Sequence, residues 1–258
     1  MINPLVYNVN HKNNVEIDTL DIKHQRVSEA YKLVPTKDVI NKFTSLGFIV
    51  DDYKAVKVKD ASRRGYQKHF TRLSHPSMLS SRHSDVKLQL LLTNSHDGSS
   101  SFQLQLGIYR LVCSNGLVVG NTFETIRLRH AGNILEQIEP AVERMIAQLE
   151  HLDNAIDRMK MKTMTNAEIF NFYHHAVQVR YPDKRMLDVS VPINREADKG
   201  QDLFTVYNRV QEALIRGSSV STTNNRRRQS RAITSIDKDK SINMALFDLA
   251  YGLVDAVA

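Results

Sequence analysis

Two long runs of alternating apolar and polar residues lie near the middle of the chain, in "VKLQLLLT" and "FQLQLGIYRLVC". Their apolar members are Val86, Leu88, Leu90, Leu92, Phe102, Leu104, Leu106 and Ile108, and their intervening polar members include Lys87, Gln89, Gln103 and Gln105. Because successive side chains of a strand point to opposite faces, the alternation predicts two adjacent antiparallel strands that each bury one face. The segment between them, "NSHDGSSS", has the composition of a turn. We therefore expect an antiparallel sheet in the first half of the chain.

Shorter segments extend this sheet. "YKAVKVKD" and "GYQKHFTRL" alternate like strands, and "TFETIRLRH" places Ile126 and Leu128 opposite Arg127 and Arg129. Before them, "VPTKDVINKFTSLGF" predicts a short helix that ends at Gly47.

After Gly132 the apolar spacing changes to three and four residues. The seam consists of Leu135, Ile138, Val142, Met145, Leu149, Leu152, Ile156 and Met159. This spacing predicts one helix over 134–159, which either forms a coiled-coil contact with a second copy or packs within the chain. Thr165 and Glu168 have capping-box spacing, so a second helix is expected to begin there. A third helix stops at Gly217, and "SINMALFDLAYGLVDAVA" predicts an apolar helix at the end.

The predicted fold is α+β, with a central antiparallel β-meander followed by a helical C-terminal half. We expect a polar, irregular or partly helical lead-in over 1–34, a β-rich basic domain over 35–132 and a helical region over 133–258. An arginine-rich flexible loop is expected at 218–235. The two larger regions could also form one continuous domain, because 258 residues suffice for either arrangement.

Composition excludes several classes of protein. No stretch approaches the roughly 20 apolar residues needed to cross a bilayer, and the start lacks the layout of a signal peptide. The single cysteine, Cys113, excludes an internal disulfide and makes a reducing cytoplasm the expected location. We expect neither a metal site nor a cofactor, because the sequence has no zinc pattern and no phosphate-binding loop.

Basic residues are concentrated in one part of the first half. Between Lys54 and Lys87 the sequence has nine Lys and Arg residues against two acids, Asp60 and Asp85. Such segregation favours a basic surface that meets a polyanion, most often nucleic acid, although a solvated surface can also be basic.

"GYQKHFTRL" is the predicted contact strand. If Tyr66, Lys68, Phe70 and Arg72 share one face, the rings can stack on exposed bases while the cations meet phosphates, as in single-strand binding. The alternative is that the aromatic residues pack into the core. The full set of candidate nucleic-acid-binding residues is Arg63, Arg64, Tyr66, Lys68, Phe70, Arg72, Arg127, Arg129, Arg226, Arg227, Arg228 and Arg231.

Catalytic interpretations are weaker. Ser95, His96 and Asp97 are consecutive, so their side chains diverge and cannot align as a triad. Cys113 ends an apolar run, where a lone cysteine is more often a small buried hydrophobe than a nucleophile. His174 and His175 are adjacent rather than spaced by three or four, which disfavours a helical metal pair. No catalytic residue is therefore predicted, and we expect a protein that is not an enzyme.

Several segments resemble one family. They are "GYQKHFTRL", "TNSHDGSSSFQLQLGIYRLVCSNGLVV", "IRLRH", "NRVQEALIRG" and "NMALFDLAYGLV". From about residue 30 onward the chain resembles domain-of-unknown-function family 932, the "phage/plasmid-like" proteins. One departure is Phe247, where the family pattern leads us to expect tryptophan. The resemblance implies a setting in phages, prophages or plasmids, and no established activity.

Together these observations predict a DNA-binding accessory protein of a mobile element, in the cytoplasm of a bacterial host. In its most concrete form the protein binds or anneals single strands during replication or recombination. The alternative is a protein-interaction factor, such as an inhibitor of a host defence complex. The expected partners are nucleic acid, a second copy through the helix 134–159, or a host protein, and no membrane.

Overall fold

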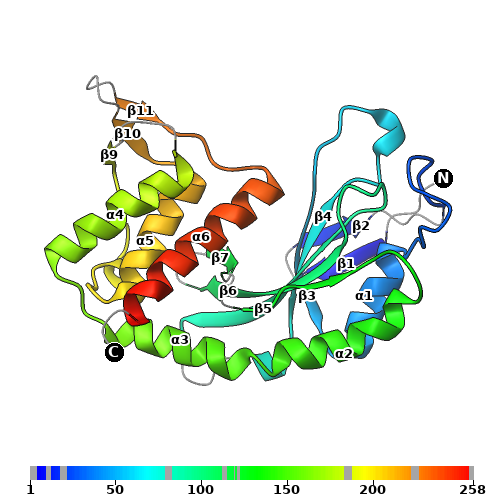
Figure 1. The fold of residues 1–258 in the computed structure, drawn as a ribbon, viewed down its shortest axis with the longest axis horizontal. Helices are drawn as coiled ribbons and strands as arrows, with labels where there is room; N and C mark the ends of the chain where they lie inside the picture. Colours follow the sequence, from blue (N-terminus) through cyan, green and yellow to red (C-terminus); the bar gives the residue numbers. More distant parts are fainter. Residues whose placement is uncertain are drawn as a thin grey trace. The chain divides into compact units, whose positions relative to one another are not determined.

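The computed structural model describes residues 5–9, 13–17, 22–78, 83–111, 115–118, 120, 123–182, 188–221 and 227–255. The chain forms two units (Figure 1). The first contains Met1–Leu111 and Phe123–Leu149, and the second contains Val112–Thr122 and Glu150–Ala258. The predicted boundary after residue 132 differs from this division, because the helix that follows it packs on the sheet of the first unit.

An antiparallel sheet forms the centre of the first unit. Its strands are β3 (Ile49–Ala55), β4 (His69–Ser74), β5 (Val86–Asn94) and β6 (Phe102–Arg110), each paired with the next, and β8 (Ile126–Leu128) pairs with β6. The predicted α+β fold and the antiparallel pair β5–β6 are thus confirmed. A separate hairpin of β1 (Leu5–Val9) and β2 (Asn13–Ile17) occupies the predicted irregular lead-in.

Two helices cover one face of this sheet (Figure 1). They are α1 (Thr36–Ser45) and α2 (Ile134–Ile146). In α1 the side chains of Val39, Ile40 and Phe43 recur at helical spacing and are fully buried. They form the main core of the unit with the leucines of β5 and β6, which burial of apolar surface stabilises.

The opposite face of the sheet is also largely buried, and the prediction of one buried face per strand is wrong. Gln89, Leu91 and Gln105 are each at most 3% exposed. Buried polar groups require partners, and the amide nitrogens of both glutamines have them: Gln89 Nε2 donates to Asp51 at 2.6 Å, and Gln105 Nε2 donates to Thr125 at 2.9 Å. Alternation in the sequence therefore separates apolar from polar residues here, but not buried from exposed ones.

The second unit is mainly helical. Its helices are α3 (Leu149–Met161, of which Leu149 is assigned to the first unit), α4 (Asn166–Arg180), α5 (Leu203–Arg216) and α6 (Ile236–Asp255). Its strands are β7 (Asn115–Val118), β9 (Asp188–Val189), β10 (Ser219–Ser221) and β11 (Arg227–Gln229), of which the last three pair in the order β11-β10-β9. α5 contacts both α4 and α6 and is buried at nearly every position from Leu203 to Leu214.

Several predicted helix ends are confirmed. Thr165 Oγ1 accepts the backbone N–H of Glu168, and the Glu168 carboxylate accepts that of Thr165, which completes the capping box. Gly217 caps α5 with a φ of 93°, a conformation that glycine adopts without strain.

The predicted single helix over 134–159 is interrupted. α2 ends at Ile146, residues 147–148 form a turn, and α3 begins at Leu149. Every seam residue from Ile138 to Met159 is buried within the chain. The stripe therefore packs within the chain, as one of the two interpretations expects, and contact with a second copy stays a prediction.

Candidate nucleic-acid interface

The connection between β3 and β4, residues 56–68, carries the densest positive charge of the first unit. We call it the basic loop. Its cations are Lys57, Lys59, Arg63, Arg64 and Lys68, and its only acid is Asp60. The backbone N–H of Val56 donates to the carbonyl of Lys68 at 2.8 Å, so the two ends of the loop are joined.

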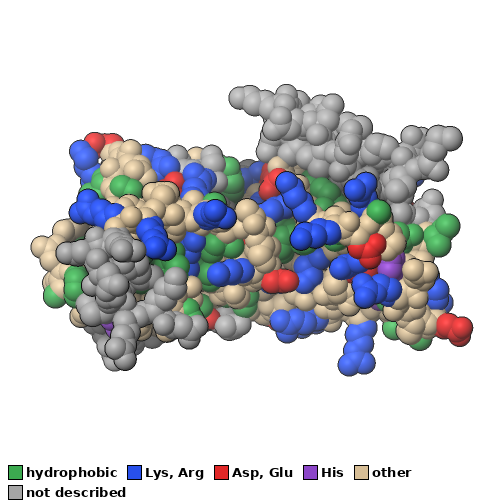
Figure 2. Space-filling model, turned by 90° about the horizontal axis from the view of Figure 1, so that it is seen from above, with side chains coloured by type: hydrophobic (Ala, Val, Ile, Leu, Met, Phe, Trp, Pro, Cys, Tyr) green, Lys and Arg blue, Asp and Glu red, His purple; other side chains and the backbone are tan. Residues whose placement is uncertain are grey.

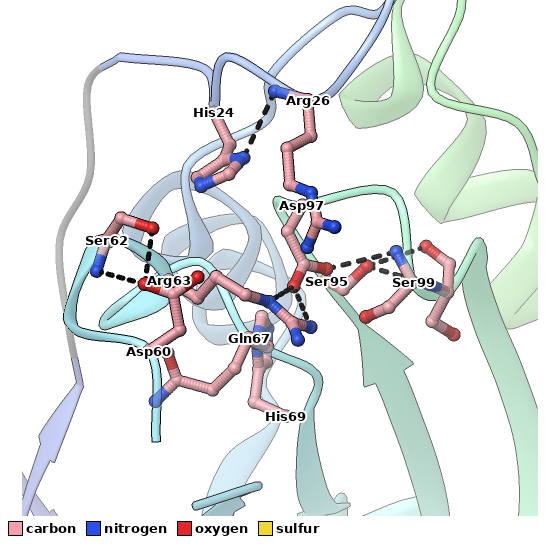
Figure 3. Close-up of polar contacts among 11 residues, drawn as sticks. His24, Arg26, Asp60, Ser62, Arg63, Gln67, His69, Ser95, Asp97 and Ser99 are labelled. Carbon is pink, nitrogen blue, oxygen red and sulfur yellow. Dashed lines mark hydrogen bonds and ion pairs between the residues drawn. The ribbon is translucent and has the colours of Figure 1, made fainter. Parts of the chain in front are cut away.

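A short 3-10 helix, η1 (Ala61–Arg63), shapes the loop. Asp60 Oδ1 accepts the backbone N–H of Ser62 at 2.9 Å and its hydroxyl at 2.7 Å, as shown in Figure 3. These hydrogen bonds lower the pKa of Asp60 below its ordinary value. The one acid of the loop is therefore used within the loop itself.

The predicted contact strand has a different geometry. β4 begins at His69, and Tyr66 and Lys68 precede it, so the proposed common face of alternating residues does not exist. Phe70 is only 8% exposed, and the Arg72 guanidinium lies over its ring at 5.1 Å. The alternative interpretation is correct for Phe70, which packs into the protein and cannot stack on a base.

Arg63 is paired with a carboxylate. Its Nη2 and Nε donate to Asp97 Oδ2 at 2.5 and 3.0 Å, while Asp97 Oδ1 accepts the N–H of Ser99 at 3.0 Å (Figure 3). The Asp97 side chain is 1% exposed. Burial alone would raise its pKa, but the hydrogen bonds from Ser99 and Arg63 outweigh burial, so the pKa is lowered. This pair ties the basic loop to the β5–β6 turn.

The remaining loop cations are better placed for a ligand. Lys57, Lys59 and Arg64 are exposed, and within the described part of the chain none of them has a carboxylate partner. Arg26, from the segment before α1, extends towards Asp97 beside the loop (Figure 3). Lys and Arg side chains predominate over acids on the face shown in Figure 2.

The other predicted cations lie elsewhere. Arg127 and Arg129 are exposed, and the predicted alternation with Ile126 is confirmed by burial. The strand register puts Arg127 in one row with Lys54, four strand spacings away, which is about 19 Å along the sheet. Arg127 is therefore well separated from the β3 edge where the basic loop begins.

The arginine cluster belongs to the second unit. Arg227 and Arg228 lie in β11, and all three residues of that strand are exposed. Part of the predicted flexible loop 218–235 is therefore a β10–β11 hairpin. Arg231 is also exposed, and its carbonyl accepts Arg180 Nη2 at 2.6 Å. Arg226 lies outside the described residues.

Ser95, His96 and Asp97 serve three separate purposes, as the turn interpretation requires. Ser95 Oγ bonds to Ser100, His96 Nε2 bonds to Thr36, and Asp97 pairs with Arg63. Cys113 lies outside the described residues. His174 and His175 are exposed on α4.

Sequence reasoning missed a group of buried histidines next to the end of the loop. His69, His96 and His130 are at most 9% exposed and are separated by 27 and 34 positions in the sequence. No spacing rule connects them, and the β4–β5, β5–β6 and β6–β8 pairings bring them together.

Comparison with known proteins identifies the family of the chain. A family model described as "Domain of unknown function (DUF932)" matches residues 23–242. The chain belongs to this family. The DUF932 resemblance expected from the quoted segments is thus confirmed.

Two relatives come from Escherichia coli (strain K12). UPF0380 protein YafZ is 29% identical over 236 residues, and UPF0380 protein YfjQ is 30% identical over 236 residues. Each alignment covers 90% of this chain and 85% of the relative. No solved structure matches the chain. Among the described residues of this DUF932 protein, no helix has the length and hydropathy required to cross a membrane.

Proposed function

We propose that this DUF932 protein binds the phosphate backbone of DNA through the basic loop, as an accessory protein of a mobile element. The observation that carries the proposal is the exposure of Lys57, Lys59 and Arg64, which have no acidic partner among the residues that the structure describes. They lie on a loop whose ends are joined and whose Arg63 is paired with Asp97. Uncompensated cations on an ordered loop release counterions from phosphate when they bind it.

The mode of binding follows from which side chains are exposed. Phe70 is buried and Tyr66 is half-buried with its ring edge-on to His24 at 4.9 Å. These two aromatic side chains therefore do not offer a platform on which bases could stack. We propose contacts with phosphate rather than with bases, so that affinity depends on salt far more than on sequence. In this proposal the protein acts by binding and not by catalysis.

Fluorescence anisotropy with labelled DNA tests the proposal. Single-stranded and duplex oligonucleotides of equal length are titrated with the full chain at 50 mM and 200 mM salt. The triple variant Lys57→Ala/Lys59→Ala/Arg64→Ala should weaken binding to both. It should also reduce the slope of log affinity against log salt by about 2 to 3, because each phosphate that is no longer neutralised lowers the slope by roughly 0.7 to 0.9.

A control variant removes the same charge from paired positions. Lys42→Ala/Arg144→Ala/Lys199→Ala removes cations that already pair with Glu139, Glu124 and Glu196, respectively. It should leave the salt slope close to that of the wild type. Absence of DNA binding at 50 mM salt, or an equal loss in both triple variants, would refute the basic loop as the site.

A further inference from the structure

A cluster of three histidines lies next to the end of the basic loop. His69 begins β4, His96 lies in the β5–β6 turn, and His130 follows β8. The hydroxyl of Thr36, the first residue of α1, lies 3.2 Å from His69 Nε2 and 2.7 Å from His96 Nε2. Asn94 Oδ1 lies 2.8 Å from His130 Nε2. We call these five residues the histidine cluster.

The hydrogen bonds determine where the protons of two rings lie. His69 Nδ1 faces the carbonyl of Gln67 at 3.3 Å, so it donates, and the neutral ring then accepts from Thr36 at Nε2. The Thr36 hydroxyl has one proton to donate, so it accepts from His96 Nε2. His96 Nδ1 is then an unprotonated nitrogen, and it is buried without a hydrogen-bond partner among the described residues.

This arrangement accepts only neutral rings at His69 and His96. A proton on His96 Nδ1 would create a buried N–H with no acceptor and a buried positive charge. A proton on His69 Nε2 would displace the Thr36 proton from its only acceptor. Both changes would favour any state in which the rings reach water.

His130 is built differently. Its Nδ1 faces the carbonyl of Lys32 at 3.3 Å, and its Nε2 faces the amide of Asn94. When Asn94 Oδ1 faces the ring, it accepts a hydrogen bond from protonated Nε2 of His130. When the Asn94 amide is rotated by half a turn, its Nδ2 donates to the unprotonated Nε2 of a neutral His130 ring. This pair can serve both protonation states, so His130 is not expected to be the group that disrupts the cluster.

In the described part of the chain, little negative charge lies near the cluster to stabilise a cation. The phenol ring of Tyr31, from the segment before α1, stacks on His130 at 4.6 Å, and the ring of Tyr53, from β3, lies 5.6 Å from His69. α1 contributes only the uncharged Thr36 hydroxyl to the described contacts. Asp97 is the carboxylate that acts on His69 and His96, and it is already paired with Arg63.

Burial accordingly lowers the pKa of all three histidines. It lowers the pKa of His69 to about 4, against the weaker opposing effect of the Gln67 hydrogen bond. Burial also lowers the pKa of His96, and the neighbouring His69 lowers it further. The pKa of His130 shifts in the same direction, opposed by its bond to Lys32.

The cluster fixes the end of the basic loop. The Gln67 carbonyl accepts from His69 Nδ1, and the Tyr66 carbonyl accepts from the backbone N–H of His96 at 2.8 Å. The Tyr31 hydroxyl donates to the carbonyl of Ser95 at 3.0 Å, which connects the same turn to the segment before α1. Protonation leaves these three hydrogen bonds in place, but the buried charge it creates favours states in which the rings reach water. Because the rings are attached to the end of the loop, such states would loosen its last residues.

We infer that the histidine cluster is an acid-sensitive latch, in which proton uptake by His69 and His96 breaks the Thr36 bridge and releases the end of the basic loop. Its significance for DNA rests on the proposed function, because the latch would then control whether the phosphate-binding cations are ordered. The latch itself can be measured without DNA, so its failure and that of the proposed function are distinguishable.

Amide hydrogen exchange on the full chain tests the latch. Opening equilibria for residues 66–69 are compared at pH 7 and pH 5, after correction for the intrinsic pH dependence of exchange. If the pKa of His69 is about 6.5 in the open state and about 4 in the closed state, proton uptake by His69 alone should raise the opening equilibrium constant about 20-fold from pH 7 to pH 5.

The variant His69→Asn/His96→Gln removes both titrating groups. The asparagine amide can replace Nδ1 as donor to Gln67, and the glutamine amide can replace Nε2 as donor to Thr36. Opening in this variant should change less than about 3-fold over the same pH range. The control His151→Gln/His174→Asn removes two exposed histidines of the second unit and should retain the wild-type response.

Three results would overturn the inference: equal corrected opening of the wild type at both pH values, a wild-type response in the double variant, or a flat response in the control. If the double variant does not fold, nitrogen-15 spectra of the wild-type imidazoles decide. The inference requires His69 and His96 to remain neutral down to about pH 5, and ordinary titration of either near 6.5 would refute it.

Discussion

The ion pair between Arg63 and Asp97 should stabilise the first unit by more than a surface pair does. Arg63 Nη2 and Nε both donate to a carboxylate that is 1% exposed, while the arginine side chain remains 29% exposed. Hydrogen bonds to charged groups contribute about 1.5–3 kcal/mol, and exposed ion pairs contribute about 0–1 kcal/mol. Because only the arginine reaches solvent, we expect a coupling energy of about 2 kcal/mol.

A double-mutant cycle measures this coupling. Free energies of unfolding are obtained from urea denaturation, followed by circular dichroism at pH 7, for Arg63→Ala, Asp97→Ala and the double variant. The bond between Asp97 and Ser99 is lost in both variants that lack Asp97, so it cancels in the cycle. The pKa of Asp97 is lowered, so the contribution is present at pH 7 and disappears as pH falls below the ordinary carboxyl range.

A coupling energy below about 0.5 kcal/mol would refute this reasoning, because it would place the pair among exposed salt bridges. Arg63 would then be available to phosphate like its neighbour Arg64. The expected result instead makes Arg63→Ala unsuitable as evidence for DNA contact, since the variant disturbs the loop itself.

Three further predictions concern stability. Leu90→Ala, at a fully buried position, should lower the free energy of unfolding measured by urea denaturation by about 3 kcal/mol. A loss below about 1 kcal/mol would contradict the assignment of Leu90 to the core. Gly217→Ala should lower the free energy of unfolding by at least about 2 kcal/mol, because its φ is +93° and the new Cβ would lie 2.3 Å from the Ser230 carbonyl oxygen. Gly132→Ala, where φ is +71° but no atom lies within 4 Å of the new Cβ, should lower it by only about 1 kcal/mol. Equal losses in the two variants would show that the close approach at Gly217 is unimportant. The pKa of His69 is lower in the folded protein than in the unfolded chain, so its contribution to stability is complete above about pH 6.5 and is lost as the pH falls towards 4. Between pH 7 and pH 5 the free energy of unfolding should therefore decrease by about 2 kcal/mol. An unchanged free energy of unfolding would contradict a neutral, buried His69 ring.

The features that sequence predicts well are those decided by neighbours along the chain. The β5–β6 pair follows from alternation, the start of α4 follows from Thr165 and Glu168, and the end of α5 follows from Gly217. Each depends on backbone geometry or on side chains a few residues apart, and tertiary packing did not override them.

The features that sequence predicts poorly depend on what packs against an element. Phe70 has the same local pattern whether it faces solvent or protein, and only the folded unit shows that it is buried. Gln89 and Gln105 look like solvent-facing residues, but their amides bond to Asp51 and Thr125 from other segments. The histidine cluster is the extreme case, because its members come from strands and turns that the sequence does not connect.

The interleaving of the two units has a consequence for the order in which the protein can form. Residues 112–122 belong to the second unit but are synthesised before residues 123–149 of the first. β7, in this early segment, contacts α6, which is the last helix among the described residues. During synthesis on the ribosome, the last residues of the first unit are therefore made while residues 112–122 still lack α6, their partner helix. A deletion that removes α6 would leave β7 without that helix, and a truncation after residue 149 would keep every residue of the first unit together with a short segment of the second.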